Sequence, residues 1–419
     1  MLTNEKTSKY AWVVLSASCL FLLYDYILQI FPSVMTNELM HAFDINATKL
    51  GNLAAFFLYS YLIAQLFAGP LIDKFGARIC ATIAIGLCAL GSLFFSLSHL
   101  LWHATLARGL MGVGAAFATV SYMKIAATWF PQRLFAFIAG LLTIPVMFGA
   151  LFGAAPMAFL VNHIGWHQSL LYTAIIGFVI TLFYGIVAKD KPKNKCLTAE
   201  KIDYAGLIKL IKNKKNWYLT IYSGLAFAPL LVFGGLWGNP FLVEAYHLNN
   251  TMAASFTSLV FIGLAIGGPL FGYISDKLQN RIKVIFWGTL LGLLCLCIII
   301  YVPHLPLSLL ALLIMMFGLG GSVFMLAFAM GKELNPIGFA ASIIALINTG
   351  DAIFAAVSQP LVGKLLDLTW QNKIINGVHY FSTNNYKIAL LLLPIYLMIA
   401  IIFLWPLRHE TIPADHTSY

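Results

Sequence analysis

Three ionisable residues interrupt segments of the chain that are otherwise apolar. They are Asp25, Arg108 and Asp351. A charged side chain inside hydrocarbon is costly unless it is paired or hydrated, so such residues often mark the path of an ion or a proton. A carboxylate that is paired in one state and exposed to protonation in another can take up and release a proton. The pattern therefore indicates proton coupling.

Asp25 and Arg108 are predicted to lie at the same depth. Asp25 is roughly 20 Å from the start of its apolar segment and Arg108 roughly 9 Å from the start of its own, at about 1.5 Å per helical residue. When two such segments cross a core about 30 Å thick in opposite directions, these depths coincide. We hypothesise that Asp25 accepts the proton and that Arg108, paired with it, tunes its pKa. A static structural bridge is the alternative.

Asp351 has no evident basic partner among the later apolar segments. It follows Asn348 and Thr349. An unpaired acid at this depth is expected to be protonated, to face water or to bind a cationic group of a substrate. A role in helix packing stays open. Lys124, near the end of its own apolar segment, is expected to extend its amine to the membrane interface.

The composition requires a membrane around most of the chain. Of the 419 residues, 61% are hydrophobic and only 10% are charged, too few to cover a soluble protein of this size. Apolar stretches of about 20 residues, each long enough to cross a bilayer, recur from end to end. We predict twelve spans at residues 11–35, 48–72, 79–99, 103–129, 132–161, 166–188, 217–242, 252–274, 282–302, 306–330, 338–363 and 386–407.

Basic residues set the predicted orientation. The formal net charge is +10, and the basic residues lie in short loops and in one lysine-rich linker, so orientation explains them better than nucleic-acid binding. With both termini in the cytoplasm, nearly all of the 25 Lys and Arg fall inside. The exceptions are Arg108 and Lys124 within span four and Lys49, Lys364, Lys373 and Lys387 outside. The expected location is the inner membrane of a bacterium, with the lipid bilayer as partner.

Two loops repeat one charged signature. The first signature reads Gly69-Pro-Leu-Ile-Asp73-Lys74-Phe-Gly76-Ala-Arg78, and the second reads Gly272-Tyr-Ile-Ser-Asp276-Lys277-Leu-Gln-Asn-Arg281. In each copy the aspartate follows the glycine by four residues and the arginine follows it by nine. Repetition of a polar loop between apolar spans predicts two similar halves. We expect six-helix bundles at 1–188 and 217–419, joined by a basic linker at 189–216.

The signatures resemble a motif of the major facilitator superfamily, and the resemblance extends over nearly the whole chain. Span four resembles the arginine and glycine pattern of that family in Arg108-Gly-Leu-Met-Gly112-Val-Gly114. Gly165-Trp166 and Gln359-Pro360 also fit. The resemblance implies an all-α integral membrane fold of two pseudo-symmetric bundles. Spans one, four, seven and ten would line a cavity that opens alternately to each side of the membrane.

The same resemblance implies a cytoplasmic gate and a secondary transporter. The gate would use Gly69, Asp73 and Arg78 in the first signature and Gly272, Asp276 and Arg281 in the second, where Gln279 stands in place of the second glycine. No metalloprotease or serine-hydrolase motif is present, so we do not expect an enzyme. We expect no cofactor beyond the proton gradient, no metal, no nucleic-acid partner and a monomer.

Polar and aromatic residues on the expected cavity faces are candidates for binding a small-molecule substrate. They are Tyr24, Tyr26, Gln29, Tyr59, Gln65, Tyr222, Trp237, Asn239 and Asn348. Spans one and seven contain no arginine, which argues against a phosphate ester. Uptake of an amino acid, a short peptide or a nucleoside by proton symport is favoured. A proton-driven exporter of organic cations is the alternative, and a solute sensor with the same fold is a further one.

Histidines gather on the predicted outer side of the membrane. His99 and His103 are four residues apart, as are His163 and His167, a spacing that can bring two imidazoles to one face of a helix. No carboxylate or thiol accompanies them in the sequence. Ordinary interfacial histidines are therefore favoured over a pH-sensitive surface, and both over metal capture.

Overall fold

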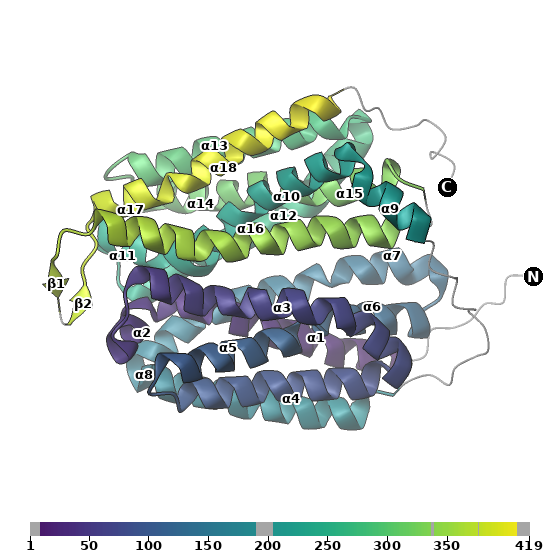
Figure 1. Cartoon of the computed structure of the whole chain (residues 1–419), viewed down its shortest axis with the longest axis horizontal. Helices are drawn as coiled ribbons and strands as arrows, with labels where there is room; N and C mark the ends of the chain where they lie inside the picture. Colours follow the sequence, from purple (N-terminus) through teal and green to yellow (C-terminus); the bar gives the residue numbers. More distant parts are fainter. Residues whose placement is uncertain (1–8, 190–203, 337–338, 376, 409–419) are drawn as a thin grey trace, which may run out of the picture. The chain divides into compact units, whose positions relative to one another are not determined.

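A computed structural model describes residues 9–189, 204–336, 339–375 and 377–408 (Figure 1). Contacts between Cα atoms divide the chain into two compact units, unit 1 at Met1–Lys195 and unit 2 at Cys196–Tyr419. Nearly every described residue is helical. The helices of unit 1 are α1 (Lys9–Ile30), η1 (Phe31–Val34), α2 (Thr36–Phe43), α3 (Ala47–Phe75), α4 (Ala77–Ser96), α5 (Leu101–Ala115), α6 (Ala118–Trp129), α7 (Gln132–Leu141) and α8 (Thr143–Val187).

Helix α8 contains two membrane spans. It belongs to a continuous apolar segment, Phe137–Val187, of 51 residues. At about 1.5 Å per residue that segment is more than twice as long as a hydrocarbon core of about 30 Å. The chain turns at Gly165, where φ is 78° and ψ is 162°, a conformation that favours glycine. The described residues hold 11 segments able to cross a membrane, and division of this one gives the twelve predicted spans.

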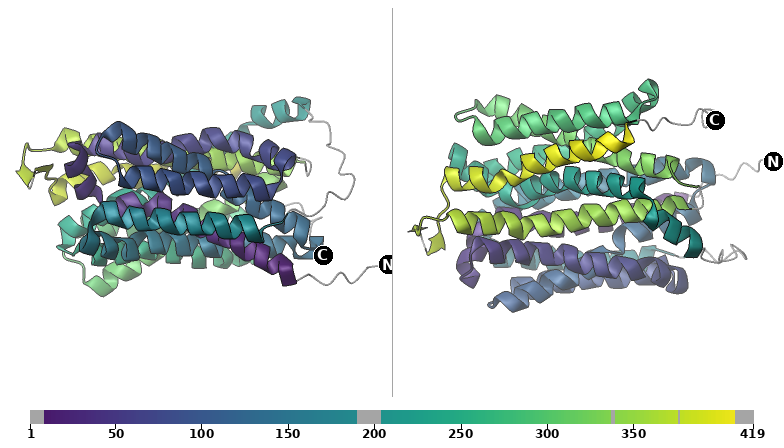
Figure 2. Two further views of the ribbon diagram at one scale, coloured as in Figure 1. Left: turned by 90° about the horizontal axis from the view of Figure 1, so that it is seen from below. Right: turned by 45° about the horizontal axis from the view of Figure 1, so that its top comes forward.

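Unit 2 repeats the helical arrangement and adds one short hairpin. Its elements are α9 (Tyr204–Lys212), α10 (Lys214–Val232), the π-helix η2 (Phe233–Trp237), α11 (Gly238–Tyr246), α12 (Asn250–Leu278), α13 (Arg281–Tyr301), α14 (Leu307–Gly321), η3 (Ser322–Met325), α15 (Leu326–Glu333), α16 (Ala340–Thr369), β1 (Ile374–Ile375), β2 (Val378–His379), α17 (Thr383–Leu390), α18 (Leu392–Leu404) and η5 (Trp405–Leu407). The two strands pair antiparallel, with Ile374 opposite His379. Figure 2 shows α16 alongside α10 within this unit.

The predicted linker lies only partly in the described chain. Residues 190–203 lie outside it, whereas helix α9 forms in its second part. Leu210 of α9 is buried, while Ile208 and Ile211 are exposed. The side chain of Asn216 donates to the Leu210 carbonyl and fixes α9 against the start of α10.

Both signature loops turn through a left-handed residue. Gly76, with φ 89°, ends α3. At the matching position of the second signature, Gln279 has φ 49° and ψ 30°, although side chains disfavour this region. The Gln279 amide side chain donates to the carbonyl oxygen of Asp276 at 2.8 Å. Local hydrogen bonding therefore supports the turn where the glycine is missing.

Glycines of span four allow helix backbones to touch. A Cβ at Gly112 would overlap the carbonyl group of Phe57 and the hydroxyl of Ser60 in α3. A Cβ at Gly114 would overlap the Ala84 carbonyl in α4. Small residues serve this purpose in membrane helices, where close packing replaces the hydrophobic effect. Figure 1 shows α5 alongside α3 and α4 as a result.

We expect Gly112→Ala to destabilise unit 1. The added methyl group meets backbone, which cannot rotate away, and overpacking of this kind costs about 1–3 kcal/mol. Gly140→Ala in α7 is the matched control, because a Cβ there has no atom within 4 Å in the part of the chain that the structure describes. Thermal melting of the two detergent-purified variants is the measurement. The melting temperature should fall by several degrees only in Gly112→Ala, and equal melting temperatures would contradict this packing account.

Candidate functional site

Asp25 is a buried carboxylate in span one. It lies in the last third of α1 and is 5% exposed. Among the described residues, no group donates a hydrogen bond to its Oδ1 atom. Ser18 and Leu28, one or two turns away along α1, are also buried, so Asp25 lies on the packed stripe of the helix. A buried ionised carboxylate without a counter-charge is expensive.

The predicted pairing of Asp25 with Arg108 is wrong for this structure. Arg108 is 1% exposed and donates to two backbone carbonyls, through Nη1 to Leu28 and through Nη2 to Ala54 at 3.1 Å. Its guanidinium carbon lies 5.1 Å from the ring centre of Phe31 and 4.8 Å from that of Phe57.

The reason for the error is the depth estimate. Leu28 lies three residues beyond Asp25, and counting residues locates a side chain no better than about one helical turn of 5.4 Å. Leu28 is also in the last turn of α1, whose free carbonyl groups carry partial negative charge. Arg108 thus compensates the partial negative charge at the end of α1 and does not form the predicted pair with the carboxylate of Asp25.

Asp351 is the second buried carboxylate, and it belongs to unit 2. It is 3% exposed, and its Oδ1 atom has no hydrogen-bond partner among the described residues. It lies close enough to Ser223 of α10 for an interaction between the carboxyl group and the buried Ser223 hydroxyl. A Cβ at Gly350 would touch Thr220, so α10 and α16 are in close contact around this pair. The arrangement offers a donor and an acceptor to a small polar group.

Four candidate binding residues are engaged inside their own units. The hydroxyl of Tyr222 lies 2.9 Å from Thr289 Oγ1, Trp237 Nε1 donates to the Gln359 carbonyl at 2.9 Å, and Asn239 Nδ2 donates to Asn250 Oδ1 at 2.6 Å. In unit 1 the Tyr24 hydroxyl faces Gly177 of α8. Each of these four side chains joins two elements of one unit.

The other candidate binding residues are partly exposed. They are Tyr26, Gln29, Tyr59, Gln65 and Asn348. A Cβ at Gly149 of α8 would press on the first carbon of the Tyr26 side chain, so span five packs closely against span one at this point. The role of these five residues in binding stays a prediction.

The charges of the first signature make contacts within unit 1. Asp73 Oδ1 lies 2.7 Å from the amine of Lys124, and both side chains are largely exposed. The interface position expected for Lys124 therefore includes an acidic partner that the sequence did not reveal. Arg78 donates to the carbonyl oxygen of Gly185 through Nε at 2.9 Å and Nη2 at 2.7 Å. An exposed ion pair contributes about 0–1 kcal/mol, so Asp73 adds little to stability.

The second signature forms a less exposed network. Arg281 contacts Asp276 Oδ1 at 3.1 Å and Glu333 Oε1 at 2.6 Å. The side chains of Arg281 and Glu333 are 14% and 20% exposed. Sequence reasoning missed Glu333, although its position after the apolar part of span ten puts it at the same membrane boundary as the second signature.

We expect Glu333→Gln to destabilise the protein more than Asp73→Asn. Charge-assisted hydrogen bonds in a shielded site contribute about 1.5–3 kcal/mol, whereas an exposed pair contributes about 0–1 kcal/mol. Melting curves of both variants, and of the Arg281→Gln/Glu333→Gln double variant, measure the difference. A coupling energy of zero between positions 281 and 333 would contradict the contact.

Two further acids outside the predicted sites have specific surroundings. Glu38 lies in α2, beyond the first span, and burial raises its pKa. Glu244 of α11 accepts a hydrogen bond from the hydroxyl of Tyr380, and this bond, with burial, raises the pKa of Tyr380. The amine of Lys373 lies 4.4 Å from the centre of the Tyr380 ring. These contacts join the chain after β2 to the end of span seven.

The histidine pairs expected from spacing are not the pairs that form. Helix α5 begins at Leu101, after His99, and the turn at Gly165 separates His163 from His167. Instead the rings of His99 and His167 lie 6.0 Å apart. Within the described residues, no group of three or more His, Cys, Asp or Glu side chains could hold a metal ion.

Comparison with known proteins agrees with the twelve spans and the repeated signature loops. The sequence model of the Major Facilitator Superfamily matches residues 15–358 and 230–417. The chain belongs to this superfamily. It is therefore a transporter that crosses the membrane many times, and members of the family are not enzymes.

The relatives of this chain are named for different solutes or for none. An uncharacterized transporter of Bacillus subtilis is 25% identical over 85% of this chain and 88% of its own. A lysosomal dipeptide transporter of Mus musculus is 25% identical over 64% of this chain and 62% of its own. A probable galactarate/D-glucarate transporter of Bacillus subtilis is 21% identical over 86% of each chain.

Similarity to solved structures supports the fold. A bacterial homologue of the human lysosomal transporter Spinster, in an inward-facing and unoccupied conformation, superimposes with a TM-score of 0.80. The two chains are 15% identical, and the match covers 95% of this chain and 97% of that one. The TM-score supports the same arrangement of helices, and the low identity leaves the substrate open.

Proposed function

We propose that this protein is a proton-coupled symporter that brings a small polar metabolite into a bacterial cell by alternating access. The observation that carries the proposal is Asp25 in span one of a membrane transporter, a buried carboxylate whose Oδ1 atom has no hydrogen-bond partner among the described residues. Its charged form becomes acceptable only when a proton, a solute group or water compensates it. A carboxyl group in this position can therefore link solute binding to proton uptake.

The transport cycle uses the two carboxylates differently. Asp25 takes a proton from the outer side and releases it to the cytoplasm after the carrier has changed state. Asp351 and Ser223 receive the solute, through an amino group or an amide N–H that donates to the carboxylate. Arg108 holds the end of α1, and thereby the helix that carries Asp25, in a fixed position.

An amino acid or a short peptide fits this chemistry best, with a nucleoside next. The relative that transports dipeptides supports this choice. The relative named for galactarate and D-glucarate is the competing example, because such a dicarboxylate needs cationic partners. In the present structure the one buried arginine of the transmembrane helices, among described residues, already donates to two backbone carbonyls.

The two signature loops form the proposed cytoplasmic gate. A Cβ at Gly69 or at Gly272 would meet no atom of the described residues within 4 Å, so both glycines have room for a closer neighbour in another state. Asp73, Arg78, Asp276 and Arg281 lie on the same loops and can exchange their present partners when the gate closes. In this proposal both termini lie in the cytoplasm. The carrier works as a monomer in the inner membrane.

A thermal-stability screen tests the proposed substrate class. Detergent-purified protein is melted with amino acids, dipeptides, nucleosides, sugars, sugar acids and cationic drugs, at pH 5.5 and 7.5. A ligand that binds the folded protein at 100 times its Kd stabilises it by about 2.7 kcal/mol. Hits among amino acids or peptides support uptake, whereas hits confined to lipophilic cations favour an exporter. A ligand that binds but is not transported into vesicles favours a sensor.

A further inference from the structure

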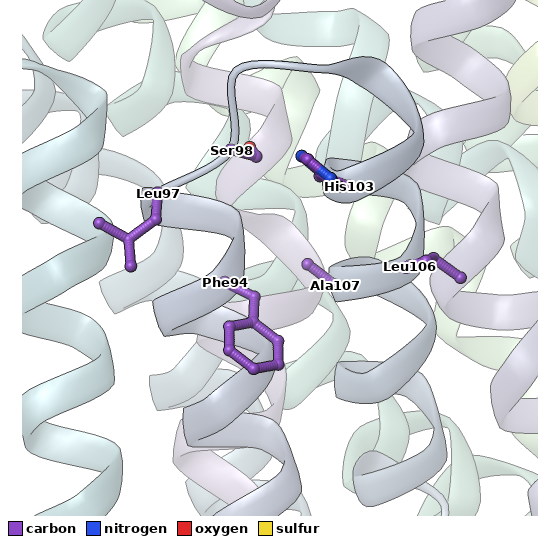
Figure 3. A pocket seen from close by; sticks show the side chains of 6 residues that line it. All are labelled: Phe94, Leu97, Ser98, His103, Leu106 and Ala107. Atoms are coloured by element: carbon purple, nitrogen blue, oxygen red, sulfur yellow. The ribbon is translucent and has the colours of Figure 1, made fainter.

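A cavity opens in unit 1 between the end of α4 and the start of α5. Its volume is about 280 Å³, and its lining consists of Phe94, Leu97, Ser98, His103, Leu106 and Ala107 (Figure 3). The first signature lies where α4 begins, and the cavity lies where α4 ends. With the orientation proposed above, the cavity is at the outer boundary of the membrane.

The lining is amphipathic along the membrane normal. Ser98 and His103 lie at the loop end, and Phe94 and Ala107 lie a turn deeper in the membrane (Figure 3). Phe94, Leu97 and Leu106 are at least half exposed at positions where a spanning helix meets lipid. The neighbouring Trp102 is 58% exposed, as is typical of residues at the membrane interface. The hydrocarbon side of this cavity therefore adjoins the bilayer itself.

The polar end suits an anion. Helix α5 begins next to the cavity, and its N-cap residue Leu100 provides no side-chain hydrogen bond. The first N–H groups of a helix lack acceptors within it and carry partial positive charge. The exposed His103 follows within that first turn and adds an imidazole donor. Together these groups match a phosphate at the depth of lipid headgroups.

We propose that this cavity binds one glycerophospholipid of the outer leaflet. One acyl chain lies against Phe94, Leu97 and Leu106, and the headgroup phosphate accepts hydrogen bonds from His103 and from the first turn of α5. The volume is just below the range of about 300–1,000 Å³ that is typical for whole small ligands, which suits part of one acyl chain. The bound lipid would hold the loop between spans three and four in place.

Native mass spectrometry of the full, delipidated protein tests the site. The protein is titrated with phosphatidylglycerol and with diacylglycerol of the same acyl chains. We expect one phosphatidylglycerol to bind about tenfold more tightly than diacylglycerol, because charge-assisted hydrogen bonds contribute that much or more. His103→Ala should remove most of this preference, whereas His163→Ala, another exposed histidine of unit 1, should keep it.

Substitutions that fill the cavity provide an independent test. Leu97→Trp should lower lipid binding at least several-fold, and Leu106→Trp serves if that variant does not fold. Ile83→Trp is the matched control, since Ile83 is a similarly exposed residue of α4 outside the lining. The proposal is overturned if the wild type binds the two lipids with equal affinity, or if Leu97→Trp and Ile83→Trp lose the same amount of lipid binding. Either result would show that lipids only coat the surface of the protein.

Discussion

Asp25→Asn is expected to abolish proton-driven accumulation while exchange of solute across the membrane continues. Asparagine retains the size of the side chain but cannot bind or release a proton, so the carrier can still change state with solute bound. Because the energy of the proton gradient reaches the solute only through this group, accumulation against a gradient should fall by at least tenfold. The measurement is uptake into proteoliposomes with and without an imposed pH gradient.

Two comparisons make the Asp25 result decisive. Glu38→Gln removes a different, half-buried acid that lies outside the spans, and it should leave proton-driven uptake intact. Asp25→Glu restores a titratable group and should recover part of the accumulation. Accumulation that is undiminished in Asp25→Asn would eliminate this carboxylate as the coupling group, and Asp351 would become the next candidate.

Arg108→Leu should destabilise the protein more than either Gly112→Ala or Glu333→Gln. It leaves the carbonyl oxygen of Leu28, in the last turn of α1, without a donor, which costs about 1–3 kcal/mol. It also removes a charge-assisted hydrogen bond to the carbonyl of Ala54, which lies inside α3 and keeps its helical partner. Loss of the contacts with the faces of Phe31 and Phe57 adds to this cost. For a unit of this size, a total of about 4 kcal/mol lowers the melting temperature by roughly 8–16 °C.

Lys124→Leu is the matched control for Arg108→Leu. Lys124 lies on α6, at the other end of the same predicted span, and its partner Asp73 is exposed, so the melting temperature should change by only a few degrees. Arg108→Lys should be intermediate, because one amine replaces two donor groups directed at different carbonyls. It should also leave the pH dependence of transport unchanged, since Arg108 does not contact Asp25 in this structure. A shifted pH profile would show that the two residues pair in another state.

The sequence predicted the membrane spans well because they depend on local composition. An apolar run of sufficient length determines each span, and Gly165 marks the turn between spans five and six. The glycines of span four also had a local signal, since Gly112 and Gly114 recur where small residues allow backbone contact. The short β hairpin had no such signal, because two-residue strands carry no periodicity.

Side-chain partners were much harder to predict because they depend on tertiary contacts. The depth of Arg108 was estimated to about one turn, which is the distance that separates Asp25 from the Leu28 carbonyl. Glu333 and Glu244 find their partners 52 and 136 residues away in the chain. The prediction of the histidine pairs failed because a spacing of four residues brings two side chains to one face only within one continuous helix. Tyr222 and Trp237, expected to bind substrate, were indistinguishable in the sequence from residues that pack helices.

In the proposed cycle, solute and proton cross the membrane together. The most direct test is to load proteoliposomes with a fluorescent pH indicator and to add the ligand identified by the stability screen. Inward movement of solute should acidify the lumen without an imposed pH gradient, and Asp25→Asn should remove this signal while exchange persists. Solute entry at the same rate with and without a pH gradient, with no change of lumenal pH, would contradict the account.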